Sequence, residues 1–156
     1  MRPTQDKVRN AVFSSLYDAV EGAKVLDLFC GTGAYGLEAL SRGASSAVFV
    51  DINTALVQKN AEMADRGTCR IIKAKAEAVL ERLDKGFDLI FIDPPYGNAD
   101  SEMLIKKIYD NEILANEGIL IYEESVRTEF FYPKETFEII NEKKYGDTKI
   151  YYLSVK

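Results

Sequence analysis

Four short apolar runs, each followed by a stretch with helical periodicity, place the strongest constraint on the fold of this chain. The runs cover residues 24–29, 47–50, 70–72 and 87–92. A chain that alternates strands and helices in this way forms a mostly parallel sheet with helices on both faces. Leu89–Ile92 is continuously apolar, which is typical of a strand buried on both faces. We therefore predict an α/β protein built on a parallel sheet.

The two ends of the chain add a helix and a hairpin to this core. Thr4 is a predicted N-cap, and apolar side chains then recur along one face of a helix. They are Val8, Val12, Leu16 and Ala19. Residues 137–140 and 149–155 flank a Gly-Asp turn in Tyr145–Thr148, which predicts an antiparallel hairpin. With a further strand at 118–122, the prediction is seven strands.

The chain has 156 residues, which is the length of one domain. We predict a single domain over residues 1–156. Its N-terminal helix covers about 4–20, the α/β core covers about 23–125, and the C-terminal hairpin covers about 136–156.

Composition excludes several kinds of active site. The chain has no histidine and only two cysteines, so Ser-His-Asp triads, Cys-His dyads and zinc sites are excluded, and we expect no metal. No apolar run approaches the ~20 residues of a membrane helix, and the cysteine usage favours a reducing cytoplasm. The net charge of −5 argues against a protein that binds nucleic acid non-specifically over its whole surface.

A glycine-rich loop joins the first strand of the core to its helix. Within Asp27–Gly36, glycines allow a sharp turn and close approach of a ligand. Asp51 ends the next strand, where a carboxylate typically accepts hydrogen bonds from ribose hydroxyls. The pattern fits either of two cofactors: a dinucleotide such as NAD, or S-adenosylmethionine (SAM). Asp27 suits the cationic end of SAM, so the sequence favours SAM.

Other residues near this loop complete the predicted cofactor site. Glu77 follows the third strand, where it could reach an adenine amino group or simply be a solvated helix carboxylate. We expect Cys30 to pack inside the loop rather than act as a nucleophile. The candidate SAM-binding residues are Asp27, Phe29, Gly31, Thr32, Gly33, Asp51, Ile52, Glu77 and Asp93.

The segment Asp93-Pro94-Pro95-Tyr96 is the predicted catalytic site. It follows the fourth strand, and two prolines make a rigid turn that presents a carboxylate and carbonyl acceptors. Such acceptors can hold both N–H bonds of an exocyclic amine on a nucleobase and stabilise the charge that develops during methylation. Tyr96 can stack on the base. Asp93 or water can take the released proton.

These motifs resemble the RsmD family of bacterial 16S ribosomal RNA (guanine-N2)-methyltransferases. The resemblance rests on the glycine loop, the Asp-Pro-Pro-Tyr segment, Arg2-Pro-Thr4 before a helix, Leu37–Gly43 and Tyr145–Thr148. It implies a Rossmann-like seven-stranded sheet that binds SAM and acts on a guanine amine. The implied partner is small-subunit ribosomal RNA (rRNA), partly assembled with ribosomal proteins.

The resemblance implies RNA contacts at the N-terminus, for which the candidates are Arg2, Thr4, Lys7 and Arg9. Family members usually carry a short basic segment before Arg-Pro-Thr, and without it we expect weaker RNA docking. A local basic patch in loops or near the hairpin, from Arg42, Arg127, Lys134, Lys143, Lys144 and Lys149, could also recruit RNA. We expect a monomer. The alternatives are an adenine-N6 methyltransferase, an NAD-dependent oxidoreductase and a SAM-binding module without activity.

Overall fold

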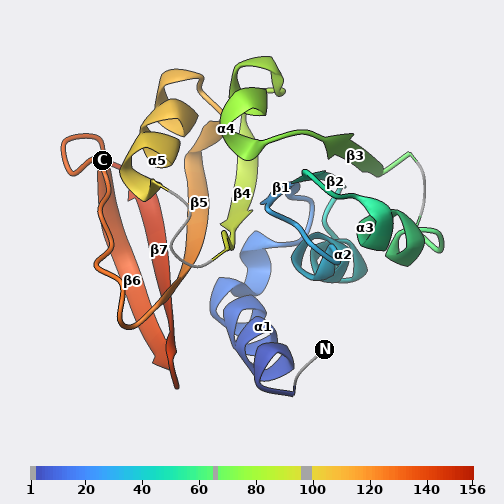
Figure 1. Cartoon of the computed structure of the whole chain (residues 1–156), viewed down its shortest axis with the longest axis horizontal. Coiled ribbons are helices and arrows are strands. Elements are labelled where there is room, and N and C mark those ends of the chain that lie inside the picture. The colour runs from blue at the N-terminus through green and yellow to red at the C-terminus, as the bar shows by residue number, and fades with distance from the viewer. Residues whose placement is uncertain (1–2, 65–66, 96–99) are drawn as a thin grey trace.

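The structure is a computed structural model that describes residues 3–64, 67–95 and 100–156 (Figure 1), with only the backbone described at Pro3 and Thr4. Seven strands form one sheet in the order β3-β2-β1-β4-β5-β7-β6. The strands are β1 (Lys24–Leu28), β2 (Ser46–Asp51), β3 (Cys69–Lys73), β4 (Phe87–Ile92), β5 (Leu114–Ser125), β6 (Phe137–Tyr145) and β7 (Thr148–Val155). The helices are α1 (Pro3–Leu16), α2 (Ala34–Ser41), α3 (Ala55–Asn60), α4 (Ala76–Val79) and α5 (Ser101–Asp110), with short 3-10 turns η1 (Tyr17–Ala19) and η2 (Leu80–Arg82).

The sheet has the predicted arrangement. Strands β3, β2, β1, β4 and β5 run parallel to one another, whereas β7 pairs antiparallel with both β5 and β6. The hairpin turn is Gly146–Asp147, between the ends of β6 and β7. The predicted parallel core with a C-terminal antiparallel hairpin is therefore confirmed.

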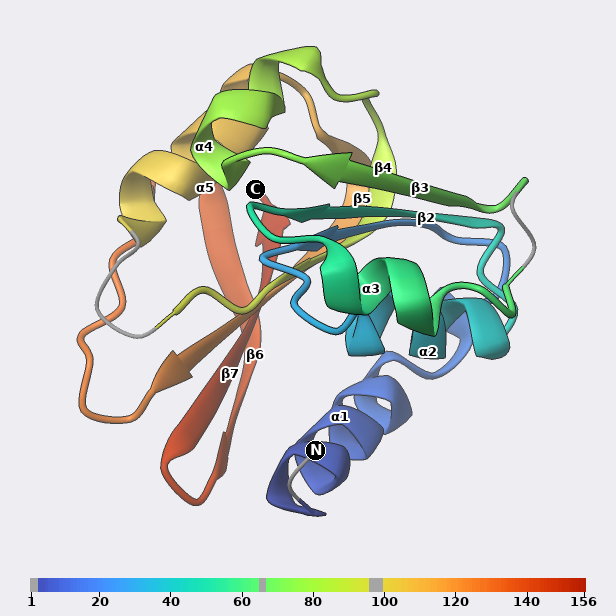
Figure 2. The same ribbon diagram turned by 45° about the vertical axis from the view of Figure 1, so that its right-hand side comes forward.

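Helices cover both faces of the sheet. Helices α1, α2 and α3 lie on one face, while α4 and α5 lie on the other (Figures 1 and 2). One core joins α1 and α2 to side chains such as Phe49 and Phe91, and the other joins α5 to side chains such as Ile90 and Tyr122. Because alternate residues of a strand face opposite sides, β4 contributes to both cores, as its apolar run predicted.

The N-terminal helix differs in detail from its prediction. Helix α1 begins at Pro3, so Thr4 lies in its first turn and not at the N-cap. Proline suits the first helical position because its missing N–H has no partner there in any case. Val8, Val12 and Leu16 are buried against the sheet, as the periodicity predicted. The helix ends at Leu16, and the 3-10 turn η1 continues to Ala19.

Strand β5 is much longer than predicted. It begins at Leu114 rather than at residue 118, and it pairs with β4 from Phe87↔Leu114 onward. The register shifts between Phe87 and Leu89, so an irregularity separates this pair from the rest of the ladder. Polar, exposed Asn116 and Glu117 lie in this part of the strand, which hides its strand character in the sequence.

The helix predicted after the third strand is also divided, into α4 and the 3-10 turn η2. Among the described residues, no helix has the length and apolar character needed to cross a membrane.

Candidate functional site

The strand order predicts a crevice at the carboxyl ends of the strands, between β1 and β4. The chain leaves β1 toward β2 in one direction and leaves β4 toward β5 in the other. Loops diverge at such a reversal, and ligands bind there at the carboxyl ends of the strands. Leu28 pairs with Ile92, so the glycine loop after β1 starts beside Asp93. The topology thus brings the two motifs of the sequence to adjacent positions.

The glycine loop uses its glycines for two different purposes. A Cβ atom on Gly33 would lie 2.5 Å from Cγ2 of Val57, and one on Gly36 would lie 2.3 Å from Cε1 of Phe49. These two glycines allow α2 to pack closely on β2 and α3. Gly31 has φ of +54°, and a Cβ there would meet no protein atom within 4 Å. Gly31 therefore faces open space that a ligand can enter.

Asp27 lies beneath this loop. It is only 3% exposed, and its Oδ2 accepts a 3.0 Å hydrogen bond from the backbone N–H of Gly36. Burial raises the pKa of Asp27 to about 8, and the charge of Asp51 adds to the increase. Burial also raises the pKa of the Cys30 thiol, helped by the same two carboxylates. Cys30 is thus a packed thiol and not an activated nucleophile.

Asp51 ties the loops after β1 and β2 together. Its Oδ2 accepts from the N–H of Gly31 at 2.8 Å, and its Oδ1 accepts from the N–H of Asn53 at 3.3 Å. Asn60 supports the loop from α3, because its amide donates to the carbonyl of Thr32 at 2.9 Å. The Asp51 carboxylate therefore lies next to the open space at Gly31, where its oxygens could accept hydrogen bonds from the two hydroxyl groups of a ribose.

The residues present fit SAM. Ile52 follows Asp51 and is 64% exposed, which leaves an apolar side chain available to an adenine ring. Glu77 lies in the first turn of α4, just after edge strand β3, and its carbonyl accepts from Lys107 Nζ at 3.4 Å. Phe29 has φ of +55° at the start of the loop, a conformation that is rare for a residue with a side chain.

Asp93 directly follows the end of β4, and buried Pro94 and exposed Pro95 come after it. Tyr96 lies outside the described residues. Asp93 is an exposed residue, and desolvation of its carboxyl group by the surrounding protein raises its pKa to about 8. The neighbouring Glu123 carboxylate, which is hydrogen-bonded to Asp93, raises the pKa further.

Sequence analysis missed two residues of this site, Glu123 and Tyr35. Glu123 is half-buried near the end of β5, and its Oε1 accepts a 3.0 Å hydrogen bond from the Tyr35 hydroxyl of α2. The ring of Tyr35 stacks on Phe91 at 5.0 Å between centroids. The available signal was position: Glu123 directly follows an apolar strand, as Asp93 does.

The predicted RNA-contacting residues have different environments. Arg2 lies outside the described residues, and Thr4 is placed only as part of α1. Lys7 is exposed. Arg9 is 17% exposed and pairs with Asp6 at 3.1 Å and with Glu38 at 3.7 Å, so its charge is largely directed to protein carboxylates.

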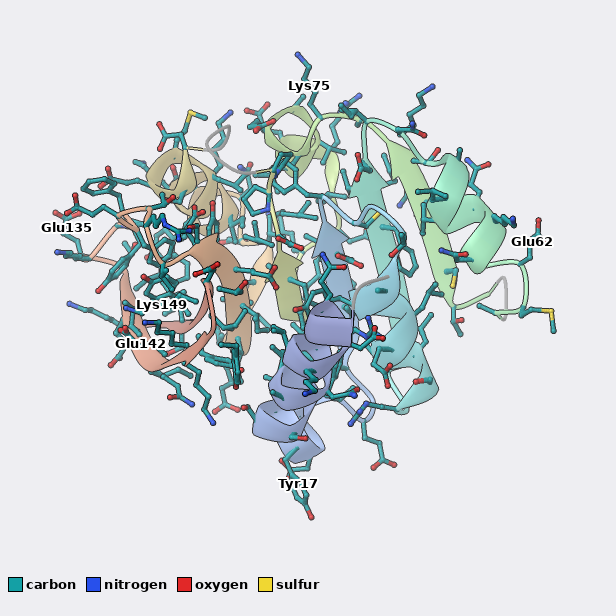
Figure 3. All side chains as sticks on the ribbon, turned by 60° about the horizontal axis from the view of Figure 1, so that its bottom comes forward. Tyr17, Glu62, Lys75, Glu135, Glu142 and Lys149 are labelled. Carbon is teal, nitrogen blue, oxygen red and sulfur yellow. The ribbon has the colours of Figure 1, made fainter. Side chains whose placement is uncertain are left out.

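The hairpin carries Lys143, Lys144 and Lys149 at the end of the sheet where Asp93 lies, because Ser125 at the carboxyl end of β5 pairs with Thr148. Arg127 and exposed Lys134 lie between β5 and β6, and Arg127 pairs with Asp147 of the hairpin turn at 3.7 Å. Figure 3 shows Lys149 beside Glu142 on this hairpin, and their charged groups lie 2.6 Å apart. Lys143 and Lys144 are exposed and belong to no ion pair formed by the described residues.

Two hollows are lined by the described residues, and the second borders the glycine loop. One, of about 320 Å³, lies at the amino ends of β1 and β4 and is lined by acidic Glu21, Asp88 and Glu117. The other, of about 340 Å³, lies beside Thr32 and is lined by Arg9. In the part of the chain that the structure describes, no group of His, Cys, Asp and Glu could hold a metal ion.

Comparison with known proteins identifies a family for this sequence. The family model described as "Conserved hypothetical protein 95" matches residues 1–154. The Escherichia coli K12 protein "Ribosomal RNA small subunit methyltransferase D" is 35% identical over 129 residues. This match covers 81% of the chain but only 65% of the Escherichia coli protein, so the chain spans just under two thirds of that relative's length.

Two further relatives extend the match. A Haemophilus influenzae protein with the same name is 28% identical, and the match covers 94% of this chain and 79% of that protein. A solved structure of a conserved hypothetical protein from Streptococcus pyogenes has a TM-score of 0.85 and 34% identity, covering 95% of this chain and 94% of that one. The sheet and its helices are therefore those of a Rossmann-like methyltransferase fold.

Proposed function

Because the chain belongs to the RsmD family of SAM-dependent methyltransferases, we propose that it methylates the exocyclic N2 amine of a guanine in 16S rRNA. Its Escherichia coli and Haemophilus influenzae relatives are both named as small-subunit rRNA methyltransferases. The substrate would be small-subunit rRNA in a partly assembled particle, which would place the enzyme in the cytoplasm.

The cofactor half of the crevice is formed by the loops after β1, β2 and β3. Asp51 would hold the ribose hydroxyls, Gly31 would allow the ligand to approach the backbone, and Ile52 and Glu77 would border the adenine. Bound SAM supplies a methyl group on a cationic sulfur, which is already activated for transfer. Asp27 holds the loop through Gly36 and adds a nearby acidic group.

The substrate half is formed by the loops after β4 and β5. A guanine N2 amine is a poor nucleophile because its lone pair is delocalised into the ring. A carboxyl oxygen of Asp93 and the Pro94 carbonyl would accept its two N–H bonds and favour a tetrahedral nitrogen. Held in this way, the amine would be oriented for attack, and positioning would supply much of the rate. Tyr96 would stack on the base.

One observation carries the proposal: the pairing of Leu28 with Ile92 brings Asp93 and its prolines next to the glycine loop. An amine-binding turn beside a SAM-binding loop is the arrangement that amine methylation needs. Lys143 and Lys144, exposed on the hairpin at the same edge, would contact the RNA backbone.

The test is transfer of labelled methyl from SAM to small ribosomal subunits that lack the modification, followed by digestion to nucleosides. We expect label in N2-methylguanine, with kcat at least 100-fold lower for Asp93→Ala, because the amine then loses an acceptor. Asp84→Ala is the matched control, since Asp84 is an exposed residue between η2 and β4, at the amino end of that strand.

Three results would contradict the proposal. Label in N6-methyladenine would identify an adenine methyltransferase. SAM binding without transfer to any rRNA would identify a binding module. Protection from heat by NAD, but not by SAM, would identify an oxidoreductase.

A further inference from the structure

Three acidic side chains lie at the carboxyl ends of three adjacent strands. They are Asp27 on β1, Asp93 after β4 and Glu123 on β5. The register extends from Ile92↔Tyr122, so Asp93 and Glu123 occupy neighbouring positions. No ion pair among the described residues involves any of the three. Their charges are therefore balanced by protons and hydrogen bonds and not by lysine or arginine.

Two of these carboxyl groups are hydrogen-bonded to each other. A hydrogen bond joins Asp93 to Glu123, and two carboxyl groups can make such a bond only if one of them carries a proton. The Tyr35 hydroxyl donates to Glu123 at 3.0 Å and therefore favours the charged form of Glu123. The shared proton consequently resides on Asp93, which donates it to Glu123.

The groups around Glu123 agree on this assignment. Burial raises the pKa of Glu123, while the hydrogen bonds from Tyr35 and Asp93 oppose that increase. For Asp93, burial, the bond to Glu123 and the charges of Asp27 and Glu124 all raise the pKa. Burial also lifts the pKa of Tyr35 above its usual range, so its hydroxyl stays protonated and continues to donate.

We propose that Glu123, held by Tyr35, is a positioning residue that receives the substrate proton through Asp93. This inference rests on the proposed function. The amine proton passes to the free carboxyl oxygen of Asp93 while the proton on its other oxygen passes to Glu123. A nitrogen–carbon bond forms as a carbon–sulfur bond breaks, and the electron pair of the broken bond stays on sulfur. Asp93 ends as it began, and Glu123 holds the released proton.

This relay accounts for the two properties of Asp93. A neutral carboxyl group still presents a carbonyl oxygen, which can accept an N–H of the amine. Asp93 is exposed and so can be reached by a substrate, while Glu123 is half-buried and bonded to Tyr35 of α2. By contrast, a charged carboxylate without such a partner would have to lose its bound water before it could accept the amine proton, which costs free energy.

Glu123→Gln tests the relay with little change in shape. The glutamine carbonyl can still accept from Tyr35 and its amide can donate to Asp93, but the side chain cannot take a proton. We expect kcat to fall by roughly 10- to 100-fold, with KM for SAM and RNA unchanged, and the pH dependence of kcat to move to lower pH. Tyr35→Phe, which keeps the ring on Phe91, should give a smaller loss.

A second readout uses the free protein. Carbon-13 NMR of the side-chain carboxyls should show the Asp93 pKa falling by at least about one unit in Glu123→Gln, because the neighbouring charge is replaced by a donor. Glu117→Gln is the matched control. It makes the same change on β5, next to the hollow at the amino ends of β1 and β4, and should alter neither readout.

The outcomes separate this inference from the methylation itself. If the wild-type chain methylates guanine but Glu123→Gln leaves kcat, its pH profile or the Asp93 titration unchanged, the relay is wrong and the proposed function stands. If Glu123→Gln shifts the Asp93 titration but the wild-type chain methylates no rRNA, the proposed function fails and the relay fails with it.

Discussion

The cofactor half and the substrate half of the crevice both have acidic residues at the carboxyl ends of strands, but these residues have different roles in the two halves. Asp27 and Asp51 each accept hydrogen bonds from backbone N–H groups of the glycine loop. Asp93 and Glu123 instead bond to each other, and a tyrosine hydroxyl supports them. The hydrogen-bond partners, and not the position, decide what a strand-end carboxyl does: in one half it orders a loop, and in the other it shares a proton with a second carboxyl.

The largest expected effect that tests this contrast is the change in folding stability with pH that Asp27 produces. A buried carboxyl whose pKa is raised from 3.8 to about 8 binds its proton more tightly in the folded than in the unfolded chain. Its contribution to stability is therefore present at low pH and is lost as the pH rises from about 4 to about 8. Between pH 5 and pH 8 we expect Asp27 to cost on the order of 3 kcal/mol.

Asp27→Asn should remove this loss, because asparagine can still accept from the Gly36 N–H without a charge. Urea denaturation of both proteins at several pH values measures the difference. Equal pH slopes for the two proteins would mean that Asp27 is already ionised in the fold.

The next effect separates cofactor binding from substrate binding. Asp51→Asn leaves one acceptor for the Gly31 N–H but removes the charge that would receive ribose hydroxyls. We expect SAM affinity to fall by roughly 10- to 100-fold, as for hydrogen bonds to a charged group. Calorimetric titration with SAM measures this effect, and Glu62→Gln, an exposed change in the turn after α3, is the control (Figure 3). Unchanged affinity would assign Asp51 to loop structure alone.

A third effect distinguishes packing from ligand approach within one loop. In Gly36→Ala the new methyl group would meet the fully buried ring of Phe49, which should cost about 1–2 kcal/mol of folding free energy. Gly31→Ala meets no protein atom, so its cost is the strain of its positive φ, about 1 kcal/mol, together with weaker SAM binding. Urea denaturation and SAM titration of both variants measure the two effects. If Gly31→Ala bound SAM normally, the open space at Gly31 would not be the cofactor site.

The smallest effect concerns the RNA surface beside the substrate half. Lys143→Gln with Lys144→Gln should reduce by about 2 the slope of log affinity against log salt, and should weaken RNA binding a few-fold. Lys75→Gln, an exposed lysine at the start of α4, is the control (Figure 3). Fluorescence titrations with an rRNA fragment at three salt concentrations measure the slope. An unchanged slope would remove the hairpin from the RNA interface.

Local signals in the sequence predicted the parts of the fold that depend on local structure. Strand β4 has the predicted bounds, because an apolar run and two prolines define its end. The glycine loop follows from backbone conformations that favour glycine, such as the positive φ of Gly31 and Gly33. Helix α1 begins two residues earlier than an N-cap at Thr4 predicts, since Pro3 can itself begin the helix.

Features that depend on distant contacts were not predictable in this way. The bond between Tyr35 and Glu123 joins residues 88 positions apart, and only the sheet order brings them together. The early start of β5 depends on the pairing of Leu114 with Phe87. The polar residues Asn116 and Glu117 give no sign in the sequence that this part of the chain is a strand. The partners of Asp27 and Asp93, and so their raised pKa values, were likewise set by the tertiary fold.

The reversal of strand order between β1 and β4 also divides the chain along its length. Residues 24–79 supply the loops of the cofactor half, and residues 87–125 with the hairpin supply those of the substrate half. Under the proposed function, substitutions that change which base or which RNA is recognised would accumulate in the second segment, while the first would continue to bind the methyl donor. A protein of this kind could then act on a new target while it keeps the same methyl-transfer reaction.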